Sequence, residues 1–390
     1  MSLLSRLRKS KRLYGALSRL RSAFGRAFMD CAHAAAGVRR DKVVFSSFAG
    51  AAYSDNPRAV CESLRRMCPE ARIVWQLSPK AAGLDEVPDG IRTVRPRSLA
   101  VLYAYATARV IVDNLNRPVY IRKYPDQVYI QTWHGDRGMK KVLLDLRDGI
   151  PYPDGTYMDL AVSGSRFATG VFRSAFGYAG QVLECGCPRN DVLVDPPEGL
   201  AASVRRKLGI PEGASVLLYA PTFRNDTVGA EQKGGLKLND LTGRLERMTG
   251  RPWVALTRGH VLNRGMSCEG GTDVSRYPEM SHLLLISDLL ITDYSSCAGD
   301  MFLREKPVIL YEPDKRAYVE RDRSFYYDPD DSPYWVAHDE AELYALLERL
   351  DEAPGNAREL REYFGVTESG EASARVAEFI RQALYEGQEA

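Results

Sequence analysis

The chain has 390 residues, of which 45% are hydrophobic and 27% charged, with a formal net charge of +2. This composition is typical of globular proteins, and the length favours two domains over one. Residues 1–29 contain eight of the 53 Lys and Arg residues and no acidic residue, so the remainder has 45 basic against 51 acidic residues. A body with a net charge of −6 gives no reason to expect nucleic-acid binding.

The cysteines and histidines do not predict a metal site. The seven Cys are scattered without a CxxC pair, and none of the five His lies at zinc-ligand spacing from them. We therefore expect reduced thiols, no metal and no cofactor. No apolar run approaches the roughly 18 residues that span a bilayer, and the N-terminus lacks the apolar segment of a signal peptide. The expected location is inside the cell.

Residues 1–40 form a basic arm. Its apolar residues recur at steps of three and four between Arg and Lys: Leu3, Leu7, Tyr14, Leu17, Leu20, Phe24 and Phe28. This pattern predicts an amphipathic basic helix that lies on an anionic membrane surface through residues 1–29. The alternative is a helix that packs on its own domain with Arg stems pointing outward. So many cations without one acid favour the membrane surface.

Strands and helices alternate through the rest of the chain. In residues 41–195, strands are expected at 43–48, 72–77, 110–113, 128–133, 160–163 and 182–184, and helices at 57–67, 99–107 and 166–175. In residues 196–390, strands are expected at 216–220, 253–257, 289–292 and 308–311, and helices at 238–248, 340–350 and 372–385. This alternation predicts an α/β protein with two Rossmann-like, doubly wound domains facing a cleft.

The stretch 286–310 shows most clearly where a ligand would bind. An apolar strand at 289–292 ends in the polar turn Asp293-Tyr294-Ser295-Ser296, and a helical pattern and a second strand follow. Ligands of open α/β sheets bind at the carboxyl ends of strands, and a helix N-terminus suits a phosphate. The alternative is that Ser295 and Ser296 only cap the helix.

Three other strand ends carry reactive or cationic side chains. They are Thr132-Trp133-His134-Gly135, Thr222-Phe223-Arg224 and Arg258-Gly259-His260. A neutral His is the commonest general base near neutral pH, and Arg binds phosphate through its planar fork. A local backbone contact for the His and a surface ion pair for the Arg are the alternatives. Together the four strand ends predict a cleft that holds a phosphorylated ligand.

At these residues the chain resembles the CDP-glycerol glycerophosphotransferase family of teichoic acid synthesis. The matching pieces follow the family's order over about residues 43–385: QTWHG (131–135), GCPRND (186–191), YAPTFR (219–224), RGH (258–260), SDLLITDYSS (287–296), Asp300, KPVILY (306–311), FYYDPDDSP (325–333) and GEASARVAEFI (370–380). The resemblance implies a GT-B fold. It also implies transfer of glycerol phosphate from CDP-glycerol to a hydroxyl of a lipid-linked saccharide or growing polymer, with release of CMP.

The resemblance also implies roles for individual residues. His134 and His260 would be catalytic. The donor phosphates and ribose would be bound by Arg258, Ser295, Ser296, Arg224, Thr222 and Asp300. The acceptor side would comprise Trp133, Gly135, Asp136 and Arg137, which we expect in an exposed turn. Positioned donors and cations would carry the catalysis without metal.

Several points stay open at this stage. Asp136-Arg137-Gly138-Met139 departs from the small-Pro-Leu turn of many relatives, which leaves the acceptor unassigned. CDP-ribitol in place of CDP-glycerol, a sugar nucleotide, and a scaffold without catalysis are the alternatives. The implied location is the cytoplasmic face of a bacterial membrane.

Overall fold

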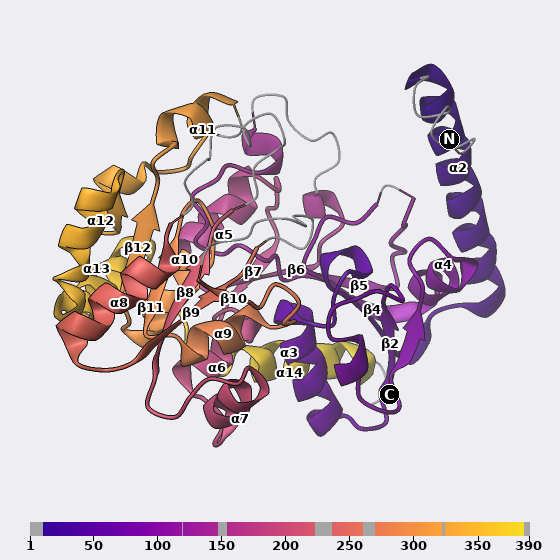
Figure 1. The fold of residues 1–390 in the computed structure, drawn as a ribbon. Coiled ribbons are helices and arrows are strands. Elements are labelled where there is room, and N and C mark those ends of the chain that lie inside the picture. Colours follow the sequence, from indigo (N-terminus) through magenta and orange to yellow (C-terminus); the bar gives the residue numbers. More distant parts are fainter. Residues whose placement is uncertain are drawn as a thin grey trace, which may run out of the picture.

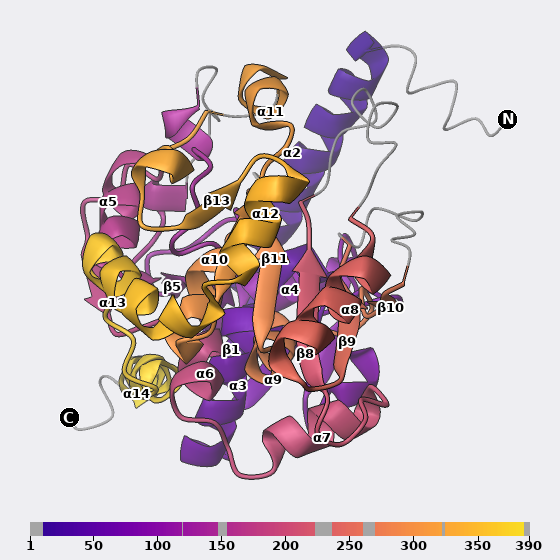
Figure 2. The same cartoon turned by 60° about the vertical axis from the view of Figure 1, so that its left-hand side comes forward.

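The computed structural model describes residues 11–118, 120–146, 154–222, 236–259, 270–321 and 324–385. Two parallel sheets form the two halves of the molecule (Figures 1 and 2). The first has the order β3-β2-β1-β4-β5-β6-β7 and the second the order β10-β9-β8-β11-β12-β13. The predicted pair of doubly wound α/β domains is confirmed.

The first sheet contains β1 (Arg39–Ser46), β2 (Arg72–Gln76), β3 (Arg92–Val94), β4 (Ala108–Asp113), β5 (Val128–Gln131), β6 (Leu160–Ser163) and β7 (Gln181–Glu184). Its helices are α2 (Lys11–Ala36), α3 (Asp55–Met67), α4 (Leu99–Ala106) and α5 (Arg166–Ser174). Val43, Val44 and Phe45 are fully buried, because both faces of a parallel sheet are covered. The short α6 (Asp191–Val194) and α7 (Leu200–Lys207) lead to the second sheet.

The second sheet contains β8 (Ser215–Ala220), β9 (Trp253–Thr257), β10 (Thr272–Asp273), β11 (Leu289–Thr292), β12 (Val308–Tyr311) and β13 (Trp335–Ala337). Its helices are α8 (Leu238–Thr249), α9 (Met280–Ile286), α10 (Ala298–Met301), α11 (Lys315–Arg321), α12 (Glu340–Leu347) and α13 (Ala353–Phe364). Separate buried clusters cover its two faces, one around Leu218 and Leu290 and the other around Leu217 and Ile291. Successive residues of one strand thus enter opposite cores.

The last helix, α14 (Ala372–Tyr385), returns to the first domain. Val376 and Ile380 belong to the same buried cluster as Val43 and Phe45, and α14 lies beside α3 in Figure 1. The prediction that residues 196–390 form one domain is therefore wrong for this helix. Its apolar face covers the first sheet, which sequence order alone does not reveal.

Helix α2 projects from the body in both views (Figures 1 and 2). Its C-terminal part packs on the first domain through Met29 and Phe28, whereas Leu20 and Phe24 are 67% and 62% exposed. None of the described helices has the length and hydropathy to cross a membrane.

Candidate active site between the two domains

His134 follows β5 at the carboxyl edge of the first sheet, and one hydrogen bond fixes its ring. Nδ1 lies 2.7 Å from the backbone oxygen of Asn114, which comes directly after the neighbouring strand β4. Because a carbonyl oxygen only accepts, Nδ1 carries the proton and Nε2 keeps its lone pair. Burial lowers the pKa of His134 below its ordinary value, and nearby Arg189 acts in the same direction. The imidazole is therefore neutral at about pH 7, as a general base must be.

The side chain of Asn114 ties three loops together beneath His134. Its Nδ2 donates to Asp55 at 3.0 Å and to Ser47 at 3.2 Å, and its Oδ1 accepts the backbone N–H of Phe48 at 2.8 Å. Asn114 is fully buried, so these bonds are shielded from water. Its backbone oxygen, which holds His134, is thereby kept in place.

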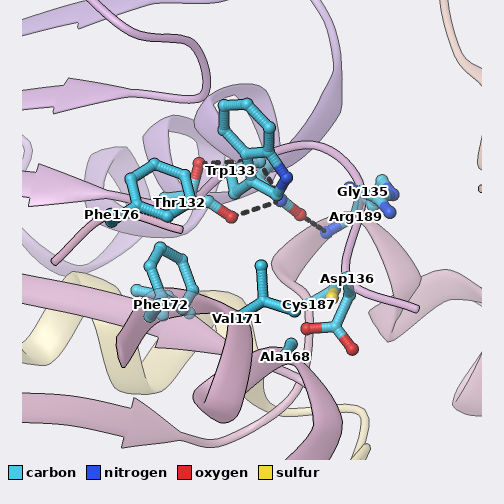
Figure 3. Close-up of a pocket in the computed structure, with 12 residues that line it drawn as sticks. Thr132, Trp133, Gly135, Asp136, Ala168, Val171, Phe172, Phe176, Cys187 and Arg189 are labelled. Carbon is cyan, nitrogen blue, oxygen red and sulfur yellow. Dashed lines mark hydrogen bonds between the residues drawn. The ribbon is translucent and has the colours of Figure 1, made fainter. Parts of the chain in front are cut away.

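Asn56 holds the backbone that precedes His134. Its Nδ2 donates to the backbone oxygens of Thr132 and Trp133 at 3.1 and 2.9 Å, and its Oδ1 accepts the N–H of Arg189 at 3.0 Å. Figure 3 shows Thr132, Trp133 and Arg189 around a small cavity of about 10 Å³. That volume is about enough for a single water molecule, so this cavity is a feature of packing and not a substrate site.

Three non-glycine residues around His134 have a left-handed backbone. They are Phe48 (φ 48°), Asp55 (φ 65°) and Trp133 (φ 49°). The rings of Phe48 and Trp133 lie 5.4 and 4.2 Å from the imidazole. Such conformations cost about 1–3 kcal/mol each and persist only where the surroundings enforce them, which happens most often at functional sites.

Arg258 follows β9 in the second domain. Its backbone N–H donates to Tyr219 at 2.9 Å, and its enclosed Nη1 has no hydrogen-bond partner within the part of the chain that the structure describes. Burial lowers the pKa of Arg258, although the charge of Glu279 opposes this effect. A guanidinium with an unused donor inside the protein suits a bound anion. The predicted phosphate role of Arg258 stays a prediction that this environment favours.

Glu279 connects the second domain to the first beside this site. Its carboxylate accepts the backbone N–H of Asp55 at 3.0 and 3.2 Å and lies 3.6 Å from Nη1 of Arg58. Burial raises the pKa of Glu279 to about 7, although Arg58 acts against this. The strained Asp55 is thus held from both domains.

Ser295 and Ser296 lie in the turn after β11, and Ser296 meets the turn that carries His134. A methyl group added to Gly135 would lie 3.6 Å from Cβ and Oγ of Ser296, and one added to Gly138 would lie 3.4 Å from its Cβ. The residues predicted for the donor and for the acceptor side therefore come together across the two domains.

The helix after these serines is short. Helix α10 has four residues, and its N-cap is Cys297, so neither serine caps it. Because one turn supplies little dipole, a phosphate at this turn would depend on the hydroxyls and backbone N–H groups, and the phosphate role of the turn stays a prediction. The two hydroxyls remain candidates for a ligand.

Asp136 and Arg137 are not in an exposed turn, so this prediction is wrong. They are only 7% and 1% exposed. Asp136 accepts hydrogen bonds from the N–H of Gly164 at 2.7 Å and the hydroxyl of Ser165 at 2.6 Å. Arg137 donates from Nε to the backbone oxygen of Gly299 at 2.7 Å. Their charges face the interior, and their acceptor-side role has no further support in the geometry.

Arg137 belongs to a buried group of five charged residues and one amide that we call the interdomain clamp: Asp136, Arg137, Arg189, Asn190, Asp300 and Glu368. Arg137 lies 3.0 Å from Asp300 and 2.9 Å from Glu368, and Arg189 lies 3.0 Å from Asp300. Burial acts to raise the pKa of Asp300, but the two guanidinium groups hold it below its ordinary value. Asp300 was predicted near the donor ribose, and both of its carboxylate oxygens are occupied by the clamp.

The remaining predicted residues lie at the edge of the described chain. Thr222 donates its backbone N–H to Asp293 at 2.7 Å, which ties the ends of β8 and β11. Arg224 and His260 lie outside the described residues. No three His, Cys, Asp or Glu side chains within the described segments are grouped as a metal site requires.

Sequence reasoning assigned no role to Asp55, Asn114, Arg189 or Glu279. Asn114 follows a predicted strand directly, the same signal that identified His134, and Arg189 lies in a quoted motif. Asp55 and Glu279 carry no comparable signal, because their contact joins residues 224 positions apart.

Known proteins resemble the chain over its whole length. The model of the family CDP-Glycerol:Poly(glycerophosphate) glycerophosphotransferase matches residues 27–382. A teichoic acid poly(glycerol phosphate) polymerase of Staphylococcus epidermidis is 31% identical over 90% of this chain and 52% of its own length. The chain thus spans about half of that relative. A teichoic acid glycerol-phosphate transferase of Staphylococcus aureus is 30% identical over 87% of this chain and 93% of its own length.

Among solved structures, one of the wall teichoic acid polymerase TagF superposes on this chain with a TM-score of 0.80 at 28% identity. That structure is of a His-to-Asn variant soaked with CDPG. The match covers 100% of both chains. Together with the two doubly wound domains, these similarities establish the GT-B-like fold. The chain belongs to the CDP-glycerol:poly(glycerophosphate) glycerophosphotransferase family.

Proposed function

We propose that the protein transfers glycerol phosphate from CDP-glycerol to a hydroxyl of a lipid-linked saccharide or poly(glycerol phosphate) acceptor and releases CMP. His134 carries this proposal. It is a buried neutral imidazole whose Nδ1 is bound to a backbone oxygen and whose Nε2 has no hydrogen-bond partner among the described residues. Such a group is built to take a proton from a hydroxyl. Family membership supports the donor.

The reaction is a single displacement at the phosphorus that carries the glycerol. The acceptor oxygen forms a bond to this phosphorus, the bond to the bridging oxygen of the pyrophosphate breaks, and CMP leaves with that oxygen. The proton of the hydroxyl passes to Nε2 of His134. Negative charge grows on the phosphoryl oxygens and on CMP, and positioned donors stabilise it. Arg258, with its unused Nη1, and the hydroxyls of Ser295 and Ser296 are suited to this task.

Helix α2 would bring the enzyme to a lipid-linked acceptor at the cytoplasmic face of a bacterial membrane. Leu20 and Phe24 are exposed, and Arg19 and Arg21 are exposed beside them. Exposed apolar residues among cations suit an anionic lipid surface. Because Met29 anchors the other end of the helix in the first domain, the outer end is held away from the body.

The proposal is tested by CMP release from CDP-glycerol with a lipid-linked disaccharide as acceptor. His134→Ala should lower kcat by about 10²-fold or more, because general-base catalysis is lost. His33→Gln is the matched control, since His33 stacks on Tyr124 at 3.8 Å in the first domain and should retain activity. Full turnover by His134→Ala would refute the mechanism. Turnover of CDP-ribitol or a UDP-sugar in place of CDP-glycerol would refute the donor.

A further inference from the structure

His134 becomes positively charged when it takes a proton, and most of its surroundings oppose that charge. Burial disfavours the imidazolium, and the positive charges of Arg189 and Lys140 act in the same direction, so the pKa of His134 lies below its ordinary value. Of the charged side chains that act on the ring most strongly, Asp55 is the one that favours the protonated form. A buried cation is stable only with a compensating charge nearby, and Asp55 is placed to provide it.

Two consecutive hydrogen bonds connect the carboxylate of Asp55 to the imidazole. Oδ1 of Asp55 accepts a hydrogen bond from Nδ2 of Asn114 at 3.0 Å, and the backbone oxygen of Asn114 accepts one from Nδ1 of His134 at 2.7 Å. Asn114 is fully buried, so water does not compete for either bond. Because both bonds pass through one residue, a displacement of Asp55 would also displace the acceptor that orients the imidazole.

Asp55 is itself held in place from both domains. Its Oδ1 accepts the backbone N–H of Asn56 at 2.8 Å, and its own N–H donates to Glu279 of the second domain at 3.0 and 3.2 Å. The simple alternative is that Asp55, the first residue of α3, only stabilises the helix dipole. A helix start requires neither the left-handed backbone of Asp55 nor its bond to Asn114, and strain of this kind occurs most often at functional sites.

The carboxylate of Asp55 also offsets the charge of Arg189. Nη1 of Arg189 lies 3.6 Å from Oδ1 of Asp55, whose side chain is only 13% exposed. Without the charge of Asp55, the positive charges of Arg189 and Lys140 would act on His134 with less opposition. The imidazole would then bind a proton less tightly, and a weaker base takes the proton of a hydroxyl less readily.

We propose that Asp55 is a positioning residue for the base. Its carboxylate fixes the loop that holds His134, and it stabilises the imidazolium that forms during the transfer. The proton moves from the acceptor hydroxyl to Nε2 of His134, and Asp55 takes up no proton. The inference rests on the proposed function, because it takes His134 as the general base of that reaction.

The first test measures how tightly His134 holds a proton in the full chain without ligand. Labelling with ¹³C at Cε1 gives NMR signals for the five histidines, and the signal of His134 is identified by its absence from His134→Gln. Asp55→Asn keeps a side-chain oxygen and suits a left-handed backbone, but it carries no charge. It should lower the proton affinity of His134 by about 3- to 10-fold, because the attraction of a negative charge is lost.

Two further variants complete this measurement. Asp85→Asn is the matched control, because it removes the same charge from an exposed residue of the same domain. It should leave the proton affinity of His134 within about 1.5-fold of the wild-type value. Asp55→Gly also suits a left-handed backbone and should lower the proton affinity as Asp55→Asn does. It should lower kcat further than Asp55→Asn, because Asn114 also loses its hydrogen-bond acceptor.

Turnover of CDP-glycerol with a lipid-linked acceptor gives the second readout. Asp55→Asn should lower kcat at about pH 7 by about 10-fold and leave KM for CDP-glycerol within about 2-fold of the wild-type value. A lower kcat with an unchanged proton affinity of His134 would show that Asp55 acts only on the structure and would overturn the proposal. A higher proton affinity in Asp55→Asn would overturn it as well. Absence of turnover by the wild type would count against the proposed function instead, because the NMR result does not depend on the donor.

Discussion

Replacing Arg137 by alanine should lower the free energy of unfolding by about 3–5 kcal/mol, the range for breaking a buried ion pair. The side chain is 0% exposed and contacts Asp300 and Glu368 at 3.0 and 2.9 Å. Its removal also leaves the backbone oxygens of Gly164 and Gly299 without this donor. The oxygen of Gly164 keeps the N–H of Thr367 at 2.9 Å, so of these two backbone oxygens only that of Gly299 loses a bond without this replacement, at a cost of about 1–3 kcal/mol.

The partners that Asp300 and Glu368 keep in Arg137→Ala decide where, between about 3 and 5 kcal/mol, the loss of unfolding free energy falls. Asp300 keeps Arg189 and Asn190 as partners, whereas Glu368 keeps only neutral donors, the amide of Asn190 and the N–H of Cys187. We therefore expect most of the electrostatic loss at Glu368. Lowering the pH to about 5.5 should reduce the difference from wild type, because a carboxylate that loses its cation takes up a proton more readily.

Urea unfolding followed by tryptophan fluorescence and circular dichroism measures this change. Arg316→Ala is the matched control. Arg316 is 93% exposed, and its single ion pair with Glu320 should contribute less than about 0.5 kcal/mol. Arg137→Lys keeps the charge without the planar fork and should fall between wild type and Arg137→Ala. A loss below about 1 kcal/mol in Arg137→Ala, within error of the Arg316→Ala value, would refute the clamp as a source of stability.

Three further predictions concern other parts of the molecule. Burial raises the pKa of Glu279 to about 7, so the folded protein binds more protons at this residue than the unfolded chain does. The wild type should therefore lose stability relative to Glu279→Gln as the pH rises from about 4.5 to about 7. Parallel stability–pH curves of the two proteins would contradict this. Replacing Leu20 and Phe24 together by Glu should lower binding to anionic vesicles by about 10-fold or more. The melting temperature should not change, because both side chains are exposed. Unchanged sedimentation of the variant with vesicles would exclude the membrane role of α2. Asn114→Ala should lower kcat by about 10²-fold with little change in KM for CDP-glycerol, because it loosens the loops that place His134. An equal fall in kcat for Ser78→Ala, a change at a half-buried loop residue of the first domain, would contradict it.

The sequence predicted the parts of the fold that depend on local pattern. Buried parallel strands are continuous apolar runs, and β1, β5, β8 and β11 were found in this way. Strands of two or three residues, β3, β10 and β13, leave no such run and were missed. The edge of each sheet was found through polar residues that follow a strand, which identified His134 and the serine turn.

The contacts that depend on distant parts of the chain could not be predicted. Arg137 was expected in an exposed turn because charged residues surround it, yet its partners Asp300 and Glu368 are 163 and 231 positions away. A charged residue is buried only when its partners are buried with it, and a single sequence does not show which residues meet. The left-handed backbone of Asp55 could not be predicted from the sequence either, since nothing in the residue type requires it.

The interdomain clamp and the proposed base share one short turn, and this has a mechanical consequence. Arg137 lies three residues after His134 and bonds to Gly299 and Asp300, which lie within five residues of Ser295 and Ser296. The turn of the proposed base and the serine turn proposed for the donor phosphate are therefore joined by a buried hydrogen bond and a buried ion pair, which domain opening at this point would have to break. Catalysis by positioning requires such a fixed relation between base and phosphate. We expect crystal structures with and without CDP-glycerol to keep Gly135 in contact with Ser296 while the outer parts of the domains move; separation of these two residues in the free enzyme would show that the clamp closes only on binding.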